Sequence, residues 1–342
     1  MIARTARLRW VGWIALLAVA IPAPLVLSEL QLFTASRIVI FGLWATSLNL
    51  LLGQTGLVSF AHAAFFGVGA YSVGLITLHL GWPAVIGVPL SLLSGAVIAF
   101  LMGLVALRAV HLYFSMLTLA ISQLLFVIVF TSYDITLGDN GIHGIELPAF
   151  LGETSQVYWF VIAVAGLGIL ALGLVWHSPF GAALQAIRDN RLRASFIGLH
   201  VRRYELAAFT LAGMFAALAG SLFTVVNKSA YPGLLDWTQG AVPIFIILIG
   251  GMYRFYGPLV GAVAYVVLEE IVTRETLYSN LVLGAIFLVI VLVAPTGITG
   301  IAERVTGRLA RRGTRTAEAA PPASLAETLD NQLEPISRDI ET

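Results

Sequence analysis

The feature that most constrains this chain is a series of long apolar stretches, each close to the length needed to cross a lipid bilayer. A spanning helix requires about 20 mostly apolar residues. The eighth of these stretches is short and bounded by glycines, so a broken or re-entrant helix is expected there. The pattern predicts an all-α integral membrane protein with about ten transmembrane helices, at residues 11–29, 37–53, 57–79, 83–107, 110–131, 157–176, 204–227, 238–252, 257–273 and 277–294.

The composition favours a membrane-embedded chain over a soluble one. Of the 342 residues, 59% are hydrophobic and 11% are charged, whereas about a quarter of the residues in soluble domains are charged. A soluble globule could not hide so much apolar surface from water. The net charge of +1 gives no support for nucleic-acid binding. The absence of cysteine excludes disulfides, thiol catalysis and thiolate metal sites.

The basic residues predict which ends of the helices face the cytoplasm. If the N-terminus is cytoplasmic and the helices alternate, the 19 basic residues fall on the cytoplasmic side, with the exceptions of Arg37, Lys228 and Arg274. Lysine and arginine concentrate in the cytoplasmic loops of membrane proteins. The bias therefore supports this orientation and an even number of spans, with an acidic outer loop at residues 132–156.

Three regions follow from this pattern. Residues 1–35 hold a cytoplasmic N-terminus and the first helix, and residues 36–300 form a polytopic membrane domain with a cytoplasmic loop at residues 177–203. The basic start also fits a signal peptide with a cleavage site at residues 18–20, but we interpret it as an uncleaved first helix. Residues 301–342 are rich in Ala, Pro, Thr and acidic residues, which predicts a disordered cytoplasmic tail.

Ionisable residues are nearly absent from the interiors of the predicted helices. Glu269 and Glu270 lie near the outer end of the ninth helix, and His62 and His79 lie far apart on the third. An ion-driven carrier is expected to bury charged groups, and a membrane enzyme needs a polar cluster, so both rival classes are disfavoured. No glycine-rich phosphate-binding loop precedes Lys228, the one lysine. We therefore expect no catalytic residues, no metal site and no bound cofactor in this chain.

Two glycine-rich segments carry turn residues and polar side chains to the membrane. Residues 53–71 begin in a cytoplasmic turn and enter the third helix, and residues 250–258 form a turn that enters the ninth. A polar group at membrane depth needs a partner or a water-filled path. The segments fit either close helix packing or the lining of a translocation path. For a path we single out Gly53, Gln54, Gly56, Ser59, His62, Phe65, Gly67, Gly69 and Tyr71.

The cytoplasmic loop at residues 177–203 predicts a short amphipathic helix or a pair of them. Ser178 followed by Pro179 is a favourable helix start, and Gly198 can end the segment. Such a helix can lie on the lipid surface or insert its apolar stripe into the groove of a partner, and the spacing leaves both open. The apolar stripe is formed by Phe180, Leu184 and Ile187, and its spacing recurs at Leu192, Phe196 and Leu199.

Taken together, these segments resemble the membrane subunits of branched-chain amino-acid ABC importers, most closely the M-type permeases of leucine/isoleucine/valine systems. The resemblance covers residues 36–300. It is carried by five stretches in order: 49–56 with 65–71, 114–120, 138–145, 178–181 with 186–190 and 194–198, and 250–251 with 256–262.

The resemblance implies a type II ABC-importer-like permease in the inner membrane. It also implies a sister permease subunit, two cytoplasmic ATP-binding subunits that bind the ATP, and a periplasmic solute-binding protein. Residues 178–198 match the family's coupling loop, which favours a protein partner over lipid for this segment. The residues that the resemblance assigns to coupling are Phe180, Leu184, Ile187, Arg188, Asp189, Asn190, Ala194 and Gly198.

The resemblance leaves two classes of solute open. Importers of urea and short-chain amides look similar in the same segments as importers of branched-chain amino acids. A path past Phe65, Phe66 and small residues fits an aliphatic zwitterion but would also admit other small polar molecules. The expected function is therefore the translocation of branched-chain or related amino acids, driven by ATP hydrolysis in partner subunits.

Overall fold

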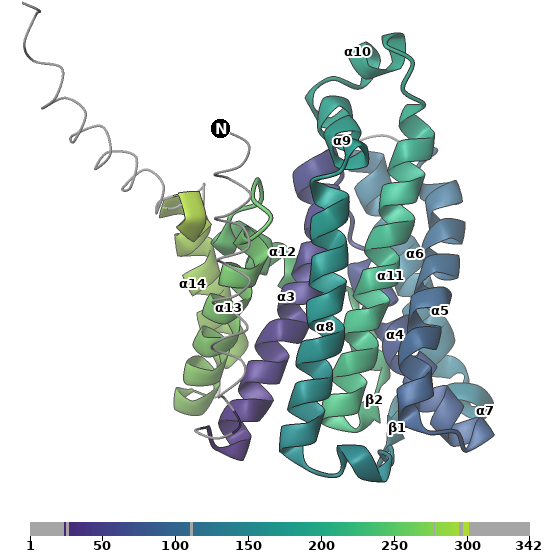
Figure 1. Cartoon of the computed structure of the whole chain (residues 1–342), viewed down its shortest axis with the longest axis vertical. Coiled ribbons are helices and arrows are strands. Elements are labelled where there is room, and N and C mark those ends of the chain that lie inside the picture. The colour runs from purple at the N-terminus through teal and green to yellow at the C-terminus, as the bar shows by residue number, and fades with distance from the viewer. Residues whose placement is uncertain (1–23, 25–26, 110–111, 277, 294–296, 301–342) are drawn as a thin grey trace, which may run out of the picture. The chain divides into compact units, whose positions relative to one another are not determined.

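The computed structural model describes residues 24, 27–109, 112–276, 278–293 and 297–300 (Figure 1). The described residues up to Thr299 belong to one compact unit. Most of the first expected helix, at 11–29, lies outside the described residues, and so does the tail at 301–342. The expected boundaries of the three regions therefore stay predictions.

Six helices in the described part of the chain are long and apolar enough to cross a membrane. They coincide with six of the stretches expected from the sequence, while the expected total of about ten stays a prediction. The six are α3 (Glu29–Thr55), α4 (His62–Leu75) with its π-helical continuation η1 (Ile76–Leu80), α5 (Ala84–Ala106), α6 (Leu112–Thr131), α8 (Thr154–Trp176) and α11 (Val201–Asn227).

The remaining elements are not among these six. The apolar helix α12 (Trp237–Gly250) is short, in keeping with its glycine-bounded sequence, and is followed by α13 (Gly257–Glu275) and α14 (Ser279–Val293). Between α8 and α11 lie α9 (Pro179–Asp189) and α10 (Arg191–Phe196). The loops contain α7 (Tyr133–Thr136), η2 (Gly138–Asn140), β1 (Ile142–His143), η3 (Ala149–Leu151), β2 (Ser229–Ala230) and η4 (Pro232–Leu235).

Helix α11 packs against α3, α4 and α5, and small residues let the backbones approach closely. A Cβ added at Gly69 of α4 would collide with the backbone of Ala217, and one added at Gly220 would collide with the backbone of Phe66. Aromatic rings fill the space beside these crossings, with the Trp44 and Phe66 centroids 4.3 Å apart. Gly69 and Gly220 are therefore helix-packing positions.

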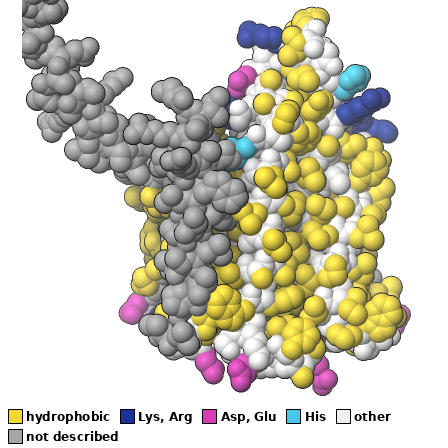
Figure 2. Space-filling model, in the orientation of Figure 1, with side chains coloured by type: hydrophobic (Ala, Val, Ile, Leu, Met, Phe, Trp, Pro, Cys, Tyr) yellow, Lys and Arg dark blue, Asp and Glu magenta, His cyan; other side chains and the backbone are white. Residues whose placement is uncertain are grey.

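Other helices present apolar side chains outward, as a protein surrounded by lipid requires. Leu93 of α5, Leu112 of α6 and Leu174 of α8 are all exposed. Figure 2 shows hydrophobic side chains along the visible flank of the molecule. Lys and Arg side chains gather at the end that carries α9 and α10, and Asp and Glu mostly at the opposite end. This separation of charge agrees with the orientation expected from the sequence.

The end opposite α9 and α10 is fastened by polar contacts between distant segments. Strands β1 and β2 pair antiparallel, with Ile142 opposite Ala230, and so attach the outer loop to the chain that follows α11. The guanidinium of Arg37 lies 2.9 Å from the Glu269 carboxylate, and the Thr34 hydroxyl donates to Glu270 at 3.1 Å. The two glutamates near the end of α13 therefore have partners in α3.

Candidate functional site

Three segments singled out from the sequence meet at the end of the molecule that carries α9 and α10. They are the last turn of α3, helix α9, and the turn at residues 251–256 between α12 and α13. The Arg188 guanidinium donates a hydrogen bond to the Gly53 carbonyl, and the Asn49 amide donates to the Arg254 carbonyl at 3.2 Å. We call this meeting of three segments the junction.

Glycines shape the part of the junction contributed by α3. A Cβ at Gly53 would collide with the Met252 carbonyl, so only glycine lets the 251–256 turn approach the helix. Gly56 ends the helix in the left-handed region, at φ 73°, and its N–H donates to the Leu51 carbonyl. Gly56 thus serves the tight turn that the sequence predicts at this position, whereas Gly53 lies within α3 and serves the approach of the 251–256 turn.

Gln54 connects α3 to the start of α9. Its side chain is fully buried. In the amide orientation that satisfies its neighbours, the nitrogen donates to the Gly181 carbonyl at 3.2 Å and the oxygen accepts from the Trp176 indole N–H at 3.0 Å. A buried amide is costly unless it is hydrogen-bonded, and here the partners lie on α8 and α9. In this arrangement Gln54 holds helices together.

The apolar stripe of α9 faces the chain's own helices. The Ser178 hydroxyl accepts from the Gly181 N–H at 3.3 Å and caps the helix as expected. Leu184 and Ile187 are completely buried, because α9 packs on α3, α8 and α11. Ala194 of α10 is buried as well. In this arrangement the surfaces of Leu184 and Ile187 are already removed from water within the chain, and the part of the stripe in contacting a partner stays a prediction.

Helix α10 presents a second apolar surface that nothing in the described chain covers. Asn190 separates the two helices, and its side-chain oxygen accepts from the Arg193 N–H at 2.8 Å. Gly198 follows in the left-handed region, at φ 89°. The large side chains between them are exposed, to 66% for Leu192, 81% for Phe196 and 71% for Ile197. We call these three side chains the tip.

The tip was not among the coupling residues expected from the sequence. The repeat of Leu192 and Phe196 was recognised, but periodicity does not reveal which of two equivalent stripes faces inward. Asp189 is exposed beside the junction and lies 3.4 Å from the Arg188 guanidinium. Among the residues expected to couple, the buried side chains of Leu184, Ile187 and Ala194 hold the segment in place. The exposed residues Asp189, Asn190 and Gly198 lie near α10.

Two contacts fix α9 and α10 to the beginning of α11. The rings of Phe180 and Tyr204 stack with centroids 5.6 Å apart. The Arg191 guanidinium donates to the Glu205 carboxylate at 2.8 Å, and the Glu205 side chain is only 1% exposed. Because a buried carboxylate requires a partner, Arg191 holds α10 in one position relative to α11.

The segment between α3 and α4 runs without helical hydrogen bonds, and side-chain hydroxyls satisfy its backbone. Thr118 accepts from the Phe60 N–H at 3.3 Å, and Ser115 donates to the Val58 carbonyl at 2.7 Å. The Ser59 hydroxyl accepts from the Ala61 N–H at 3.2 Å. Ser59, expected in a path, is therefore a local hydrogen-bonding residue here.

The other residues expected to line a path are buried between helices. A Cβ at Gly67 would collide with Leu235 of η4, and Phe65 packs edge-on to Phe209 with ring centroids 5.4 Å apart. His62 and Tyr71 are buried, and their polar side-chain atoms have no hydrogen-bond partner among the described residues. These positions are helix contacts in this arrangement, and their part in a path stays a prediction.

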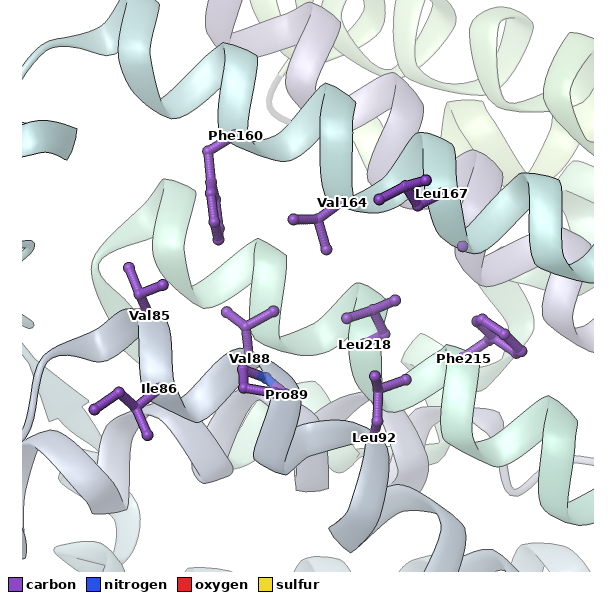
Figure 3. A pocket seen from close by; sticks show the side chains of 11 residues that line it. Val85, Ile86, Val88, Pro89, Leu92, Phe160, Val164, Leu167, Phe215 and Leu218 are labelled. Carbon is purple, nitrogen blue, oxygen red and sulfur yellow. The ribbon is translucent and has the colours of Figure 1, made fainter.

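Two cavities of the described chain lie away from the junction. One of about 580 Å³ lies between α5, α8 and α11, where apolar side chains such as Val88, Val164 and Leu218 point into a common space (Figure 3). Its apolar walls fit a hydrocarbon better than a zwitterion. Another, of about 480 Å³, lies between residues 77–83 and 142–148. Within the described ranges, no group of three His, Asp or Glu side chains could hold a metal ion.

The fold and the junction together define a class of protein: a helical, multi-span membrane component with a helix pair, α9 and α10, at one end (Figure 1). Residues 31–291 match the family described as branched-chain amino acid transport system / permease component. The chain belongs to this family.

Three relatives illustrate the match. The high-affinity branched-chain amino acid transport system permease protein LivM of Escherichia coli K12 is 25% identical, over 83% of this chain and 73% of the relative. A probable LivM permease of Methanocaldococcus jannaschii is 23% identical, over 67% and 78%. LivH of the same E. coli system is 25% identical, over 77% and 92%. Membership confirms the expected M-type permease and a transport role rather than an enzymatic one.

Proposed function

We propose that this chain is a permease subunit of an ABC importer that carries branched-chain amino acids across the inner membrane. In this proposal it adopts a type II arrangement of about ten helices and forms the pore with a sister permease. Two cytoplasmic subunits bind and hydrolyse ATP, and a periplasmic protein delivers the solute. The names of the LivM and LivH relatives support the choice of substrate.

The observation that carries the proposed coupling is the exposed tip on a firmly held support. Leu192, Phe196 and Ile197 expose large apolar surfaces at the end of the molecule where basic side chains gather. Large apolar side chains that enter a groove on another protein supply much of the binding energy of such contacts. We propose that the tip seats in a groove of an ATP-binding subunit, while Leu184 and Ile187 anchor α9 to the permease.

Alternating access then follows from the motion of the partner subunits. When ATP draws these subunits together, the tip moves with them, and the Arg191–Glu205 pair and the Phe180–Tyr204 stack pass the displacement to α11. Helix α11 contacts α3, α4 and α5 through close backbone packing. A shift of α11 therefore acts on several neighbouring helices, because closely packed interfaces transmit strain.

The test is co-purification from native membrane followed by assays of ATP hydrolysis. We expect ATP-binding subunits to accompany the tagged permease. We also expect leucine, isoleucine or valine, each with its solute-binding protein, to stimulate hydrolysis more than urea or acetamide does. Stimulation by urea or acetamide alone would contradict the proposed substrate, and a permease purified without any ATP-binding subunit would contradict the proposed class.

A further inference from the structure

Arg188 lies on α9 and, besides its ion pair with the neighbouring Asp189, contacts other parts of the permease. Its side chain is 29% exposed. The guanidinium donates to the Gly53 carbonyl in the last turn of α3. It also lies over the Tyr253 ring, with the guanidinium carbon 5.4 Å from the ring centroid. One side chain thus joins the coupling segment to α3 and to the turn between α12 and α13.

The C-terminus of α3 favours a cation at this position. The last four carbonyls of a helix have no partner within the helix and carry the negative end of its dipole. Helix α3 has no basic residue in its own last turn. Arg188 therefore supplies, from α9, the positive charge and the hydrogen-bond donor that the end of α3 lacks.

The surroundings are shaped to admit the arginine side chain. A Cβ at Gly56 would lie 3.1 Å from the Arg188 Cγ, closer than ordinary van der Waals contact. Gly56 also has φ 73°, which side-chain-bearing residues rarely adopt. The same glycine thus ends α3 and leaves room for the stem of Arg188.

We propose that Arg188 is a positioning residue that clamps α9 to α3 and to the α12–α13 turn, so that a displacement of the tip reaches helices to which α9 is not joined in sequence. The proposal rests on the proposed function. Along the chain, α9 connects directly to α8 and, through α10, to α11. Gly53 and Tyr253 lie 135 and 65 residues from Arg188 in the chain, so the clamp adds a link that the covalent connections do not provide.

The consequence is a specific kind of failure when the clamp is removed. The tip would still bind the ATP-binding subunits, because Leu192, Phe196 and Ile197 are unaffected. Hydrolysis would continue and would move α8 and α11, but α3 and α13 would follow less closely. The ratio of solute transported to ATP hydrolysed would fall, whereas assembly of the complex would not change.

The experiment measures this ratio for the complete transporter in proteoliposomes, with the wild type, Arg188→Met, Arg188→Lys, Tyr253→Leu and the double variant. We expect Arg188→Met to lower uptake per ATP about fivefold or more, a typical size for coupling between sites. Tyr253→Leu removes the cation–π contact and should lower it about two- to fivefold. Lysine retains charge but not the planar stacking group, so Arg188→Lys should fall between Arg188→Met and the wild type. The double variant should match Arg188→Met.

The matched control is Arg108→Met, which removes an exposed arginine next to α5 and should leave the ratio unchanged. An Arg188→Met complex with wild-type uptake per ATP would overturn the clamp. Loss of the ATP-binding subunits from that variant would overturn it too, since Arg188 would then belong to the docking surface. Effects of the two single variants that multiply in the double variant would also contradict it.

A second measurement separates failure of the clamp from failure of the proposed function. If the wild-type complex shows no ATP-driven uptake, the proposed function fails. The contact itself is then tested by the melting temperatures of the full chain in detergent, for Arg188→Met, Tyr253→Leu and the double variant. Decreases that are smaller in combination than their sum support the contact, and decreases that add fully overturn it.

Discussion

At the scale of single residues, the junction depends on polar and charged side chains whose partners come from distant segments of the chain. Gln54 was expected in a translocation path because polarity at membrane depth is costly. The structure gives it partners on α8 and α9, and its part in a path stays a prediction. The sequence predicts that such a residue needs partners, but it cannot name them, because Gly181 lies more than 120 residues away.

The buried pair of Arg191 and Glu205 gives an asymmetric prediction for stability. Glu205 is 1% exposed, whereas Arg191 is 38% exposed. Arg191→Met leaves a buried carboxylate without its partner and should lower the free energy of unfolding by roughly 3 kcal/mol. Glu205→Gln leaves an arginine that water can solvate and should cost only about 1 kcal/mol. Thermal unfolding in detergent measures both, and equal losses would contradict the assigned burial.

The glycine at position 69 gives a second prediction. A Cβ there collides with the backbone of Ala217, so Gly69→Ala should force α4 and α11 apart and cost about 1–3 kcal/mol or more. Gly166 of α8 is the matched control, because nothing lies within 4 Å of an added Cβ. Gly166→Ala should be neutral or stabilising by up to about 1 kcal/mol. Melting temperatures that fall equally for the two variants would contradict the close packing.

At the scale of elements, the sequence predicts where the helices lie better than it predicts which face of each helix is buried. Long apolar runs locate α5, α6 and α8 because a spanning helix has a characteristic length. The spacing also predicts α9 and its Ser178 cap. It could not decide that the first stripe faces inward and the tip outward, because both have the same period. Only packing against α3, α8 and α11 distinguishes the two.

This distinction leads to opposite outcomes for similar substitutions on α9 and α10. Phe196→Asp changes an exposed side chain and should leave the melting temperature of the permease nearly unchanged, while it abolishes co-purification of the ATP-binding subunits. Leu184→Asp buries a charge in the junction and should destabilise the permease itself by several kcal/mol. The opposite pattern, in which Leu184→Asp is folded and only unable to bind, would show that the stripe of α9 is the docking surface.

At the scale of the whole molecule, the family and the class of function follow from segments that the sequence already shows. The order of the glycine-rich turns and of the coupling segment suffices for this, because each is a local pattern. The junction could not be predicted, since its three parts are separated by long helices and meet only in the folded chain. The pairing of the two short strands β1 and β2 could not be predicted either, because residues 142–143 and 229–230 are also far apart in the chain.

The central claim is that this chain does not energise transport itself but receives its motion through the tip and the junction. The most direct measurement is leucine uptake into proteoliposomes that contain either the permease alone or the permease with its sister subunit, ATP-binding subunits and solute-binding protein. We predict accumulation only in the complete system with ATP present. Accumulation by the permease alone, driven by a proton or sodium gradient without ATP, would contradict the account.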